Sequence, residues 1–190
     1  MIAEQLIHNL EQNIATCGRG LLVIDGDCAA GKTTLAAQVC AQLDCNVFHM
    51  DDFFLPPALR TEERLAEAGG NVHYERFEKQ VLTPLFKNEP FVYGAYSCMT
   101  RKTAEVFVTP KPAAIIEGSY ALHPRFLETY GAMNAMLVFM RISAGEQLRR
   151  IQKRNGEAML RRFRDEWIPM EKRYQQAFEH QWEDVKFTDG

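Results

Sequence analysis

The apolar residues of the chain gather in short continuous runs that alternate with helical stripes. Such runs are typical of strands buried on both faces of a parallel sheet. They cover residues 21–24, 46–49, 113–116 and 136–140. Apolar residues at helical spacing lie at residues 2–14, before the first run, and at 35–43, after it. This alternation predicts an α/β fold: a three-layer parallel sheet with helices on both faces.

The segment between the second and third runs predicts an insertion at about residues 55–110. Residues 55–70 are charged, begin near two prolines and end in Gly69 and Gly70, so we expect a mobile excursion above the sheet. Apolar residues at helical spacing follow at 74–85, and two short strand-like stretches at 91–96 and 105–109 suggest a hairpin.

The C-terminal third is predicted to be mostly helical. Ser143 and Glu146 form a capping box that begins a helix, and a break is expected near Gly156. Pro169 should kink or restart the helical stretch that follows, and residues 185–187 suggest a last strand. No repeat or linker divides the chain, so residues 1–190 are predicted to form a single domain.

Composition and charge narrow the classes of function. A net charge of -3 gives no overall attraction to nucleic acid, and no apolar run approaches the roughly 20 residues of a membrane span. The first residues lack the basic flank of a signal peptide. The five cysteines form no C-x-x-C pair and are expected to be reduced thiols. These features predict a cytoplasmic protein that binds neither nucleic acid nor membrane.

The strongest motif lies directly after the first predicted strand. Residues 26–33 match G-x-x-x-x-G-K-[ST], and a helical stripe follows, which is the context of a phosphate-binding loop. Loop amides and the helix N-terminus attract phosphate, Lys32 would bridge the β- and γ-phosphates of ATP, and Thr33 would ligate Mg²⁺. The residues expected to bind the nucleotide are Gly26, Asp27, Cys28, Ala29, Ala30, Gly31, Lys32, Thr33 and Thr34.

Acidic residues follow two other predicted strands. Asp51 and Asp52 come after residues 46–49, and Glu117 ends the run at 113–116. Strand ends of this kind carry the ligands in open α/β sheets. We expect one aspartate to be the base for an attacking hydroxyl, and Asp52 and Glu117 to arrange Mg²⁺ together with Thr33.

An arginine-rich segment at about residues 141–164 predicts a helical lid. It holds eight Lys or Arg residues against two Glu, and a glycine interrupts it. Arginines that close over phosphates stabilise transferred charge and exclude water, and Arg150 and Arg154 are the candidates for this role. Neither the N-K-x-D strip of guanine-selective proteins nor the L-S-G-G-Q element of transporter ATPases occurs, so a kinase is favoured.

The order of motifs resembles the uridine kinase family of P-loop kinases. GDCAAGKTT, MDDFF, GNVHYERFEKQVLTPL and IIEGSYAL follow one another with the family's spacing over roughly residues 21–164. The DDFF element and residues 167–170 also resemble nicotinamide riboside kinases. The resemblance implies transfer of the γ-phosphate of ATP, with Mg²⁺, to a primary hydroxyl such as a ribose 5′-OH. It also implies that Asp51 is the base that contacts the acceptor, and that Glu117 belongs to the family's E-G motif.

The acceptor pocket is less well specified. By the resemblance, His73 and Tyr74 fall near the acceptor, and Arg101 matches an arginine that closes a conserved stretch. That stretch, which begins at Tyr96, lacks the family's Asp-Phe pair and its His. Phe53, Tyr74, Tyr93 and Tyr96 could stack on an aromatic base. The acceptor therefore stays open among a nucleoside, nicotinamide riboside, pantothenate and a sugar acid. An ATP-binding regulator or ATPase without an acceptor, and a homo-oligomer, also stay open.

Overall fold

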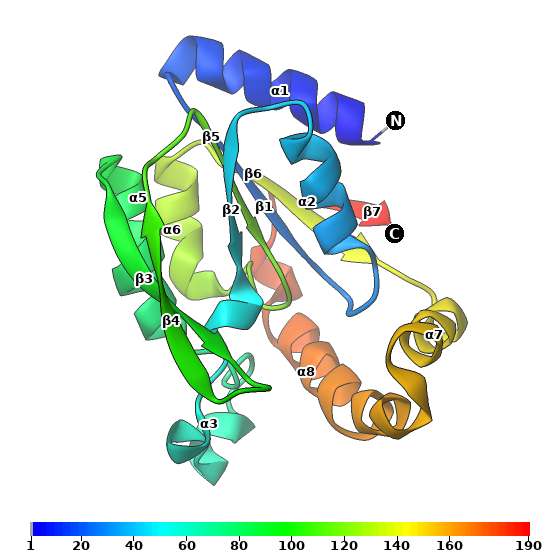
Figure 1. The fold of residues 1–190 in the computed structure, drawn as a ribbon. Helices are drawn as coiled ribbons and strands as arrows, with labels where there is room; N and C mark the ends of the chain where they lie inside the picture. Colours follow the sequence, from blue (N-terminus) through cyan, green and yellow to red (C-terminus); the bar gives the residue numbers. More distant parts are fainter. Residues whose placement is uncertain (1) are drawn as a thin grey trace.

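A five-stranded parallel sheet forms the centre of the protein (Figure 1). The computed structural model describes residues 2–190. The strand order is β2-β5-β1-β6-β7, and every neighbouring pair runs parallel. The strands are β1 (Gly20–Gly26), β2 (Cys45–His49), β5 (Ala113–Glu117), β6 (Met136–Arg141) and β7 (Lys186–Asp189). Every position of β1 and β5 is buried, as the continuous apolar runs predict.

Helices cover both faces of the sheet, so the predicted three-layer architecture is confirmed. Successive side chains of β1 point to opposite faces. Leu22 and Ile24 pack in a cluster with α1 (Ile2–Cys17) and α2 (Lys32–Cys40). Leu21 and Val23 belong to the other cluster, with α6 (Pro124–Ala132) and the helical turns of the insertion.

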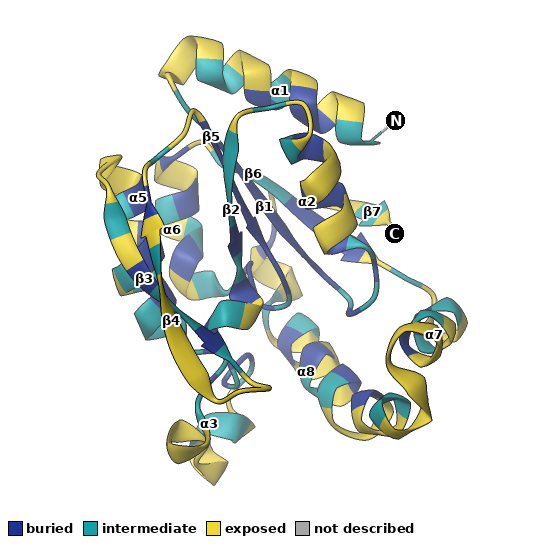
Figure 2. Cartoon of the chain, viewed as in Figure 1, coloured by how far each residue is buried: buried dark blue, intermediate teal, exposed yellow. Residues whose placement is uncertain are grey.

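The insertion contains short helices and an antiparallel hairpin. After β2 come a 3₁₀ turn with Asp51 and Asp52, two short helical elements, an irregular helix with a π-helical turn, and the hairpin. These are η1 (Met50–Phe53), η2 (Pro57–Leu59), α3 (Glu62–Ala66), α4 (Tyr74–Phe77), η3 (Glu78–Leu82), α5 (Thr83–Lys87), β3 (Phe91–Ser97) and β4 (Lys102–Val108). One face of β3 packs on the sheet layer, whereas most of β4 faces solvent (Figure 2).

The C-terminal helices lie beyond the carboxyl ends of the strands (Figure 1). They are α7 (Ala144–Arg162), a π-helical turn η4 (Phe163–Trp167), α8 (Ile168–Phe178) and a 3₁₀ turn η5 (Glu179–Gln181). The side chain of Ser143 caps α7 by accepting a hydrogen bond from the Glu146 amide. Gly156 breaks α7 with φ 77° and ψ 174°, and Pro169 lies in the first turn of α8, where a missing N–H is tolerated. None of the described helices is long and apolar enough to cross a membrane.

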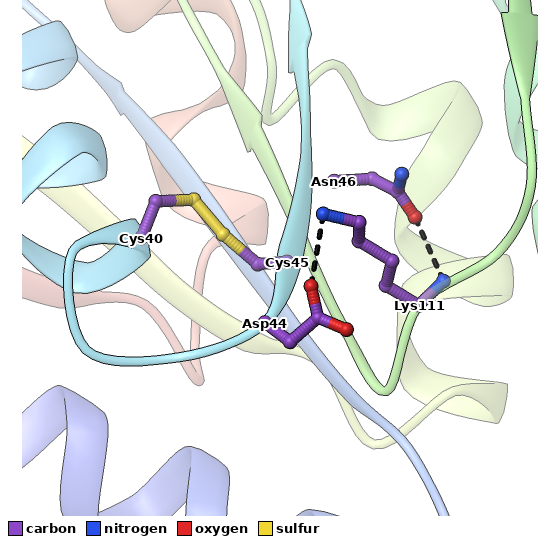
Figure 3. The surroundings of a disulfide bond; sticks show 5 residues. All are labelled: Cys40, Asp44, Cys45, Asn46 and Lys111. Atoms are coloured by element: carbon purple, nitrogen blue, oxygen red, sulfur yellow. Dashed lines mark hydrogen bonds and ion pairs between the residues drawn. A yellow bond between two sulfur atoms is a disulfide. The ribbon is translucent and has the colours of Figure 1, made fainter.

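The expectation that all cysteines are free thiols is wrong for one pair. Cys40, at the end of α2, is joined to Cys45, at the start of β2, by a disulfide with a Cα–Cα distance of 5.7 Å (Figure 3). The tight α2–β2 connection brings the two cysteines together, although no C-x-x-C spacing announces it. Cys17, Cys28 and Cys98 are free thiols, and only Cys28 of these is buried.

This crosslink should contribute modestly to stability. It closes a loop with a sequence separation of only 5 residues, for which chain entropy predicts about 2 kcal/mol. We expect Cys45→Ser to lower the unfolding free energy by this amount in urea titrations. Under non-reducing denaturing conditions the wild-type chain should expose three titratable thiols, and a count of five would contradict the disulfide. Cys98→Ser, at an exposed free thiol, is the matched control and should leave the stability unchanged.

Candidate functional site

The phosphate-binding loop connects β1 to α2 at the carboxyl edge of the sheet. Gly26 has φ 141°, and a Cβ there would lie 2.1 Å from the carbonyl oxygen of Met140 on β6. A side chain at this position would therefore push the loop off the neighbouring strand. Gly31 precedes α2 with φ 102°, in the left-handed region that glycine favours. The loop amides and the N-terminus of α2 together form a cradle suited to an anion.

A buried carboxylate fixes the start of this loop. Asp25 is 1% exposed and accepts hydrogen bonds from the amides of Gly26, Tyr120 and Leu122 and from the Tyr174 hydroxyl, at 2.6, 3.1, 2.9 and 2.8 Å. Burial raises the pKa of Asp25 to about 6, although the hydrogen bonds from Leu122, Gly26 and Tyr174 and the charge of Lys32 favour the charged form. Asp25 thus ties β1 to the turn after β5 and to α8.

Lys32 lies folded against the loop. Its Nζ donates to the carbonyl oxygens of Gly26 and Asp27 at 2.7 and 2.9 Å, and approaches the Ser119 hydroxyl at 3.4 Å. The ammonium group is therefore held over the cradle, where it can meet phosphate oxygens. The Cys28 thiol is buried within the loop, and burial raises its pKa far above the ordinary value, which makes it a poor nucleophile.

Glu117 joins three elements at the same edge. Its Oε1 accepts hydrogen bonds from the Thr33 hydroxyl on α2 at 3.1 Å and from His49 Nδ1 on β2 at 2.5 Å. His49 and Glu117 are direct partners in the β2–β5 register, so the sheet itself places their side chains together. The hydrogen bond to Glu117 raises the pKa of His49. Among residues 2–190, no group of three or more His, Cys, Asp or Glu side chains is arranged as a metal site.

Asp51 and Asp52 differ in their surroundings. Asp52 Oδ2 accepts a hydrogen bond from Tyr93 on the hairpin at 3.2 Å, and its backbone carbonyl accepts one from Arg76 at 2.7 Å. Asp51 is exposed as a residue, yet nearby protein reduces the hydration of its carboxylate. This desolvation, and next the charge of Glu117, raise the pKa of Asp51, against the opposing effect of Lys32. Desolvation also raises the pKa of Asp52.

Two helices beyond the strand ends contact the loop directly. Glu171 on α8 accepts a hydrogen bond from the Cys28 amide at 3.0 Å. Gln147 on α7 donates to the Cys28 carbonyl at 3.1 Å, and Arg150 donates to the Ala29 carbonyl at 3.2 Å. Of the two predicted lid arginines, Arg150 thus touches the loop. Arg154 is exposed and bonds to the neighbouring Asn155.

Several residues expected to contact the acceptor are engaged within the protein. Phe53 is fully buried, stacks on Tyr93 with ring centroids 5.5 Å apart, and lies beneath the Arg76 guanidinium. The ring of Tyr74 stacks on His123 at 4.7 Å, and the Arg64 guanidinium lies 3.8 Å from the same ring. Neither ring therefore offers an open face in this structure.

The other acceptor candidates are spread over the insertion. His73 Nδ1 lies 3.1 Å from a carboxylate oxygen of Glu75. Tyr96 is 8% exposed on β3, and Arg101 is exposed in the turn between β3 and β4, with φ 56°. Arg64 holds the start of the insertion by donating to the carbonyls of Gly70 and Val72 and to Glu75.

Five residues of the site were missed by the sequence reasoning: Asp25, His49, Ser119, Glu171 and Gln147. The first three adjoin recognised motifs, since each lies within two residues of Gly26, Asp51 or Glu117. A polar residue at the end of an apolar strand is the signal that could have drawn attention to Asp25 and His49. Glu171 and Gln147 come from distant helices, and no local pattern connects them to the loop.

Comparison with known proteins supports the fold. No protein-family model matches the sequence, and no match to a curated protein is found. Three similar solved structures span almost the whole chain. A possible uridine kinase from Bacillus stearothermophilus is 21% identical, with a TM-score of 0.64 over 99% of this chain and 100% of that one. A protein from Silicibacter sp. TM1040, proposed to be a fructose transport system kinase, is 23% identical, with a TM-score of 0.69 over 93% and 95% of the two chains.

The third structure is YFH7 from Saccharomyces cerevisiae, proposed to be a P-loop containing kinase with a circular permutation. It is 8% identical, with a TM-score of 0.74 over 99% of both chains. At these identities the likeness concerns the fold. Together with the strand order and the loop geometry, it confirms the predicted α/β P-loop fold.

The pKa of Asp25 leads to a prediction about stability. Because the pKa in the folded chain is raised to about 6 from 3.8, the folded state binds more protons than the unfolded state between these values. The unfolding free energy of wild type minus that of Asp25→Asn should therefore fall as the pH rises from 4 to 6, and then level off. Urea unfolding of both proteins across this range measures the difference, and other titrating groups cancel in it.

A difference that grows with pH would mean that the four hydrogen bonds outweigh burial and lower the pKa of Asp25. At pH 7, Asp25→Asn should lower the unfolding free energy by about 1–3 kcal/mol. The asparagine side chain replaces one acceptor oxygen by an NH₂ group, so that N–H donors face each other and some buried donors lose their acceptor.

Proposed function

We propose that this protein is an ATP-dependent kinase that transfers the γ-phosphate to a hydroxyl group of a small, nucleoside-like metabolite. One observation carries the proposal: a phosphate-binding loop with its lysine lies at the edge of the sheet where the strands that precede Asp51 and end in Glu117 also finish. A protein that only binds a nucleotide has no need of a carboxylate base beside the terminal phosphate. The kinase fold of the similar structures agrees with this function.

The donor half would be built from the loop and the first turn of α2. The amides of residues 28–34 and the Lys32 ammonium would hold the phosphates of ATP. Thr33 and Glu117, whose hydroxyl and carboxylate oxygens lie 3.1 Å apart, would hold Mg²⁺ together with Asp52, because Mg²⁺ takes oxygen ligands. When bound, Mg²⁺ supplies charge that neutralises the phosphate oxygens during transfer.

Asp51 is the better candidate for the base. The Asp52 carboxylate accepts a hydrogen bond from Tyr93, whereas Asp51 is an exposed residue. A raised pKa makes Asp51 a stronger proton acceptor than an ordinary aspartate. Asp51 would orient the acceptor hydroxyl and take its proton as the oxygen attacks the γ-phosphorus.

The arginine-rich helix α7 would complete the site from the other side. Arg150 lies against the loop, and its guanidinium could turn from the Ala29 carbonyl toward a phosphate oxygen. Arg154 lies farther along α7 and would join only if the helix closes. Such closure would exclude water that otherwise hydrolyses ATP.

The acceptor is proposed by class only. The similar structures include a possible uridine kinase and a proposed fructose transport system kinase, so a nucleoside and a sugar are both candidates, with nicotinamide riboside and pantothenate. His73, Tyr74, Tyr96 and Arg101, together with Phe53, are the acceptor-side residues by resemblance. Phe53 and Tyr74 would act by shaping the wall of the pocket, because their rings are covered. A cytoplasmic location and a homo-oligomer belong to the same proposal.

The test of the proposed chemistry is Asp51→Asn. This variant should keep ATP affinity, measured by calorimetry, and lose phosphoryl transfer by about two to four orders of magnitude, because the proton acceptor is gone. Lys32→Ala is the complementary variant and should lose ATP binding itself. Unchanged turnover in Asp51→Asn would exclude Asp51 as the base.

The acceptor should be sought by measuring ADP release over uridine, other nucleosides, nicotinamide riboside, pantothenate and sugars, with the product identified by mass. A kinase gives ADP in equal amount to one phosphorylated product. ADP release without any such product would instead indicate an ATPase or an ATP-binding regulator.

A further inference from the structure

A carboxylate of the chain itself occupies part of the phosphate-binding loop. Glu171 is 7% exposed, and its Oε2 accepts the hydrogen bond of the Cys28 amide at 3.0 Å. Its Oε1 accepts one from the Ser119 hydroxyl at 2.7 Å, and this hydroxyl lies 3.4 Å from Lys32 Nζ. The Glu171 side chain thus accepts hydrogen bonds both from a loop amide and from Ser119, which in turn contacts Lys32.

The contact belongs to a whole face of α8. Tyr174 and Gln175 lie three and four residues after Glu171, so the three side chains lie on one side of the helix. Tyr174 donates to Asp25 and Gln175 Nε2 donates to Asp27, each at 2.8 Å. These three side chains of α8 therefore hold Cys28, Asp25 and Asp27, which lie on the segment from β1 into the loop.

The chemistry of the loop explains why a carboxylate binds there. Amides that converge on one point, at the start of a helix, attract an anion, and a carboxylate resembles the edge of a phosphate in its two oxygens and its charge. A phosphate that takes the Cys28 amide must replace Glu171 Oε2. Unless Glu171 then withdraws, two anions share a largely buried position and repel each other.

We propose that Glu171 is an internal competitor of the nucleotide phosphate, which must be displaced from the Cys28 amide before ATP is fully bound. Displacement frees the Ser119 hydroxyl for the ammonium group of Lys32 or for a phosphate oxygen. Because Tyr174 and Gln175 share the helix face with Glu171, occupancy of the loop is also communicated to α8. This inference rests on the proposed function, in that the displacing anion is the phosphate of a nucleotide.

The test is the affinity for ADP, ATP and pyrophosphate of Glu171→Gln, measured by calorimetry. Glutamine has the same shape and can still accept the Cys28 hydrogen bond, but it carries no charge. We expect Glu171→Gln to bind each ligand about tenfold more tightly than wild type, a change of about 1.4 kcal/mol, which is within the range of a like-charge repulsion at partly buried sites. Glu179→Gln, at the exposed ion pair with Arg141, removes the same charge away from the loop and should bind as wild type.

Equal or weaker binding by Glu171→Gln than by Glu179→Gln would overturn the proposal. Glu171→Asp covers the case in which the glutamine variant does not fold. It keeps the charge but shortens the side chain by one methylene, and it should bind between wild type and the tenfold gain; binding weaker than wild type would count against the competition. Failure of wild type to bind any nucleotide would instead contradict the proposed function. The failure of the Glu171 proposal and the failure of the proposed function are therefore distinguishable.

Discussion

One buried carboxylate organises the carboxyl edge of the sheet, where the candidate site lies. Asp25 receives hydrogen bonds from its own strand end, from the turn after β5 and from α8. Three segments that are far apart in the sequence therefore donate hydrogen bonds to the two carboxylate oxygens of Asp25. The loop, the Glu117 edge and the helix that carries Glu171 depend on this point for their relative positions. Such a buried group is costly unless all its partners are present, so the arrangement is specific as well as stable.

The parallel register of the strands fixes the positions of the residues at the strand ends, as Asp25 fixes the position of the loop. Since β1 and β2 both pair with β5, their carboxyl ends finish at one edge. Thr33, His49 and Glu117 meet there through hydrogen bonds, and desolvation and the charge of Glu117 raise the pKa of Asp51 against the opposing effect of the Lys32 charge. Opposite charges concentrated on a rigid edge, under helices that can exclude water, are the physical basis of the proposed phosphoryl transfer.

The predictable features were those encoded in short stretches of sequence. The continuous apolar character of residues 21–24 and 113–116 predicted buried strands. The glycines and the lysine of residues 26–33 predicted the loop, because its geometry requires them. The Cys40–Cys45 pair, the covered rings of Phe53 and Tyr74, and the contact of Glu171 with Cys28 could not be foreseen in this way. Each depends on where the chain returns in space, which residue type and local spacing do not determine. An aromatic residue in a motif, for example, is equally suited to a core and to a ligand.

The break in α7 has a mechanical consequence. Gly156 is the residue of that helix whose dihedrals leave the helical region, and beyond it the chain continues through η4 into α8 in helical conformation. Bending between the two parts is therefore concentrated at one glycine. The helical stretch from 157 to 167, which ends in the π-helical turn η4, is an arm of roughly 16 Å at about 1.5 Å per residue. A rotation of about ten degrees at its pivot would carry its far end by nearly 3 Å, which is the length of a hydrogen bond. The arm thus converts a small torsion into the making or breaking of a contact.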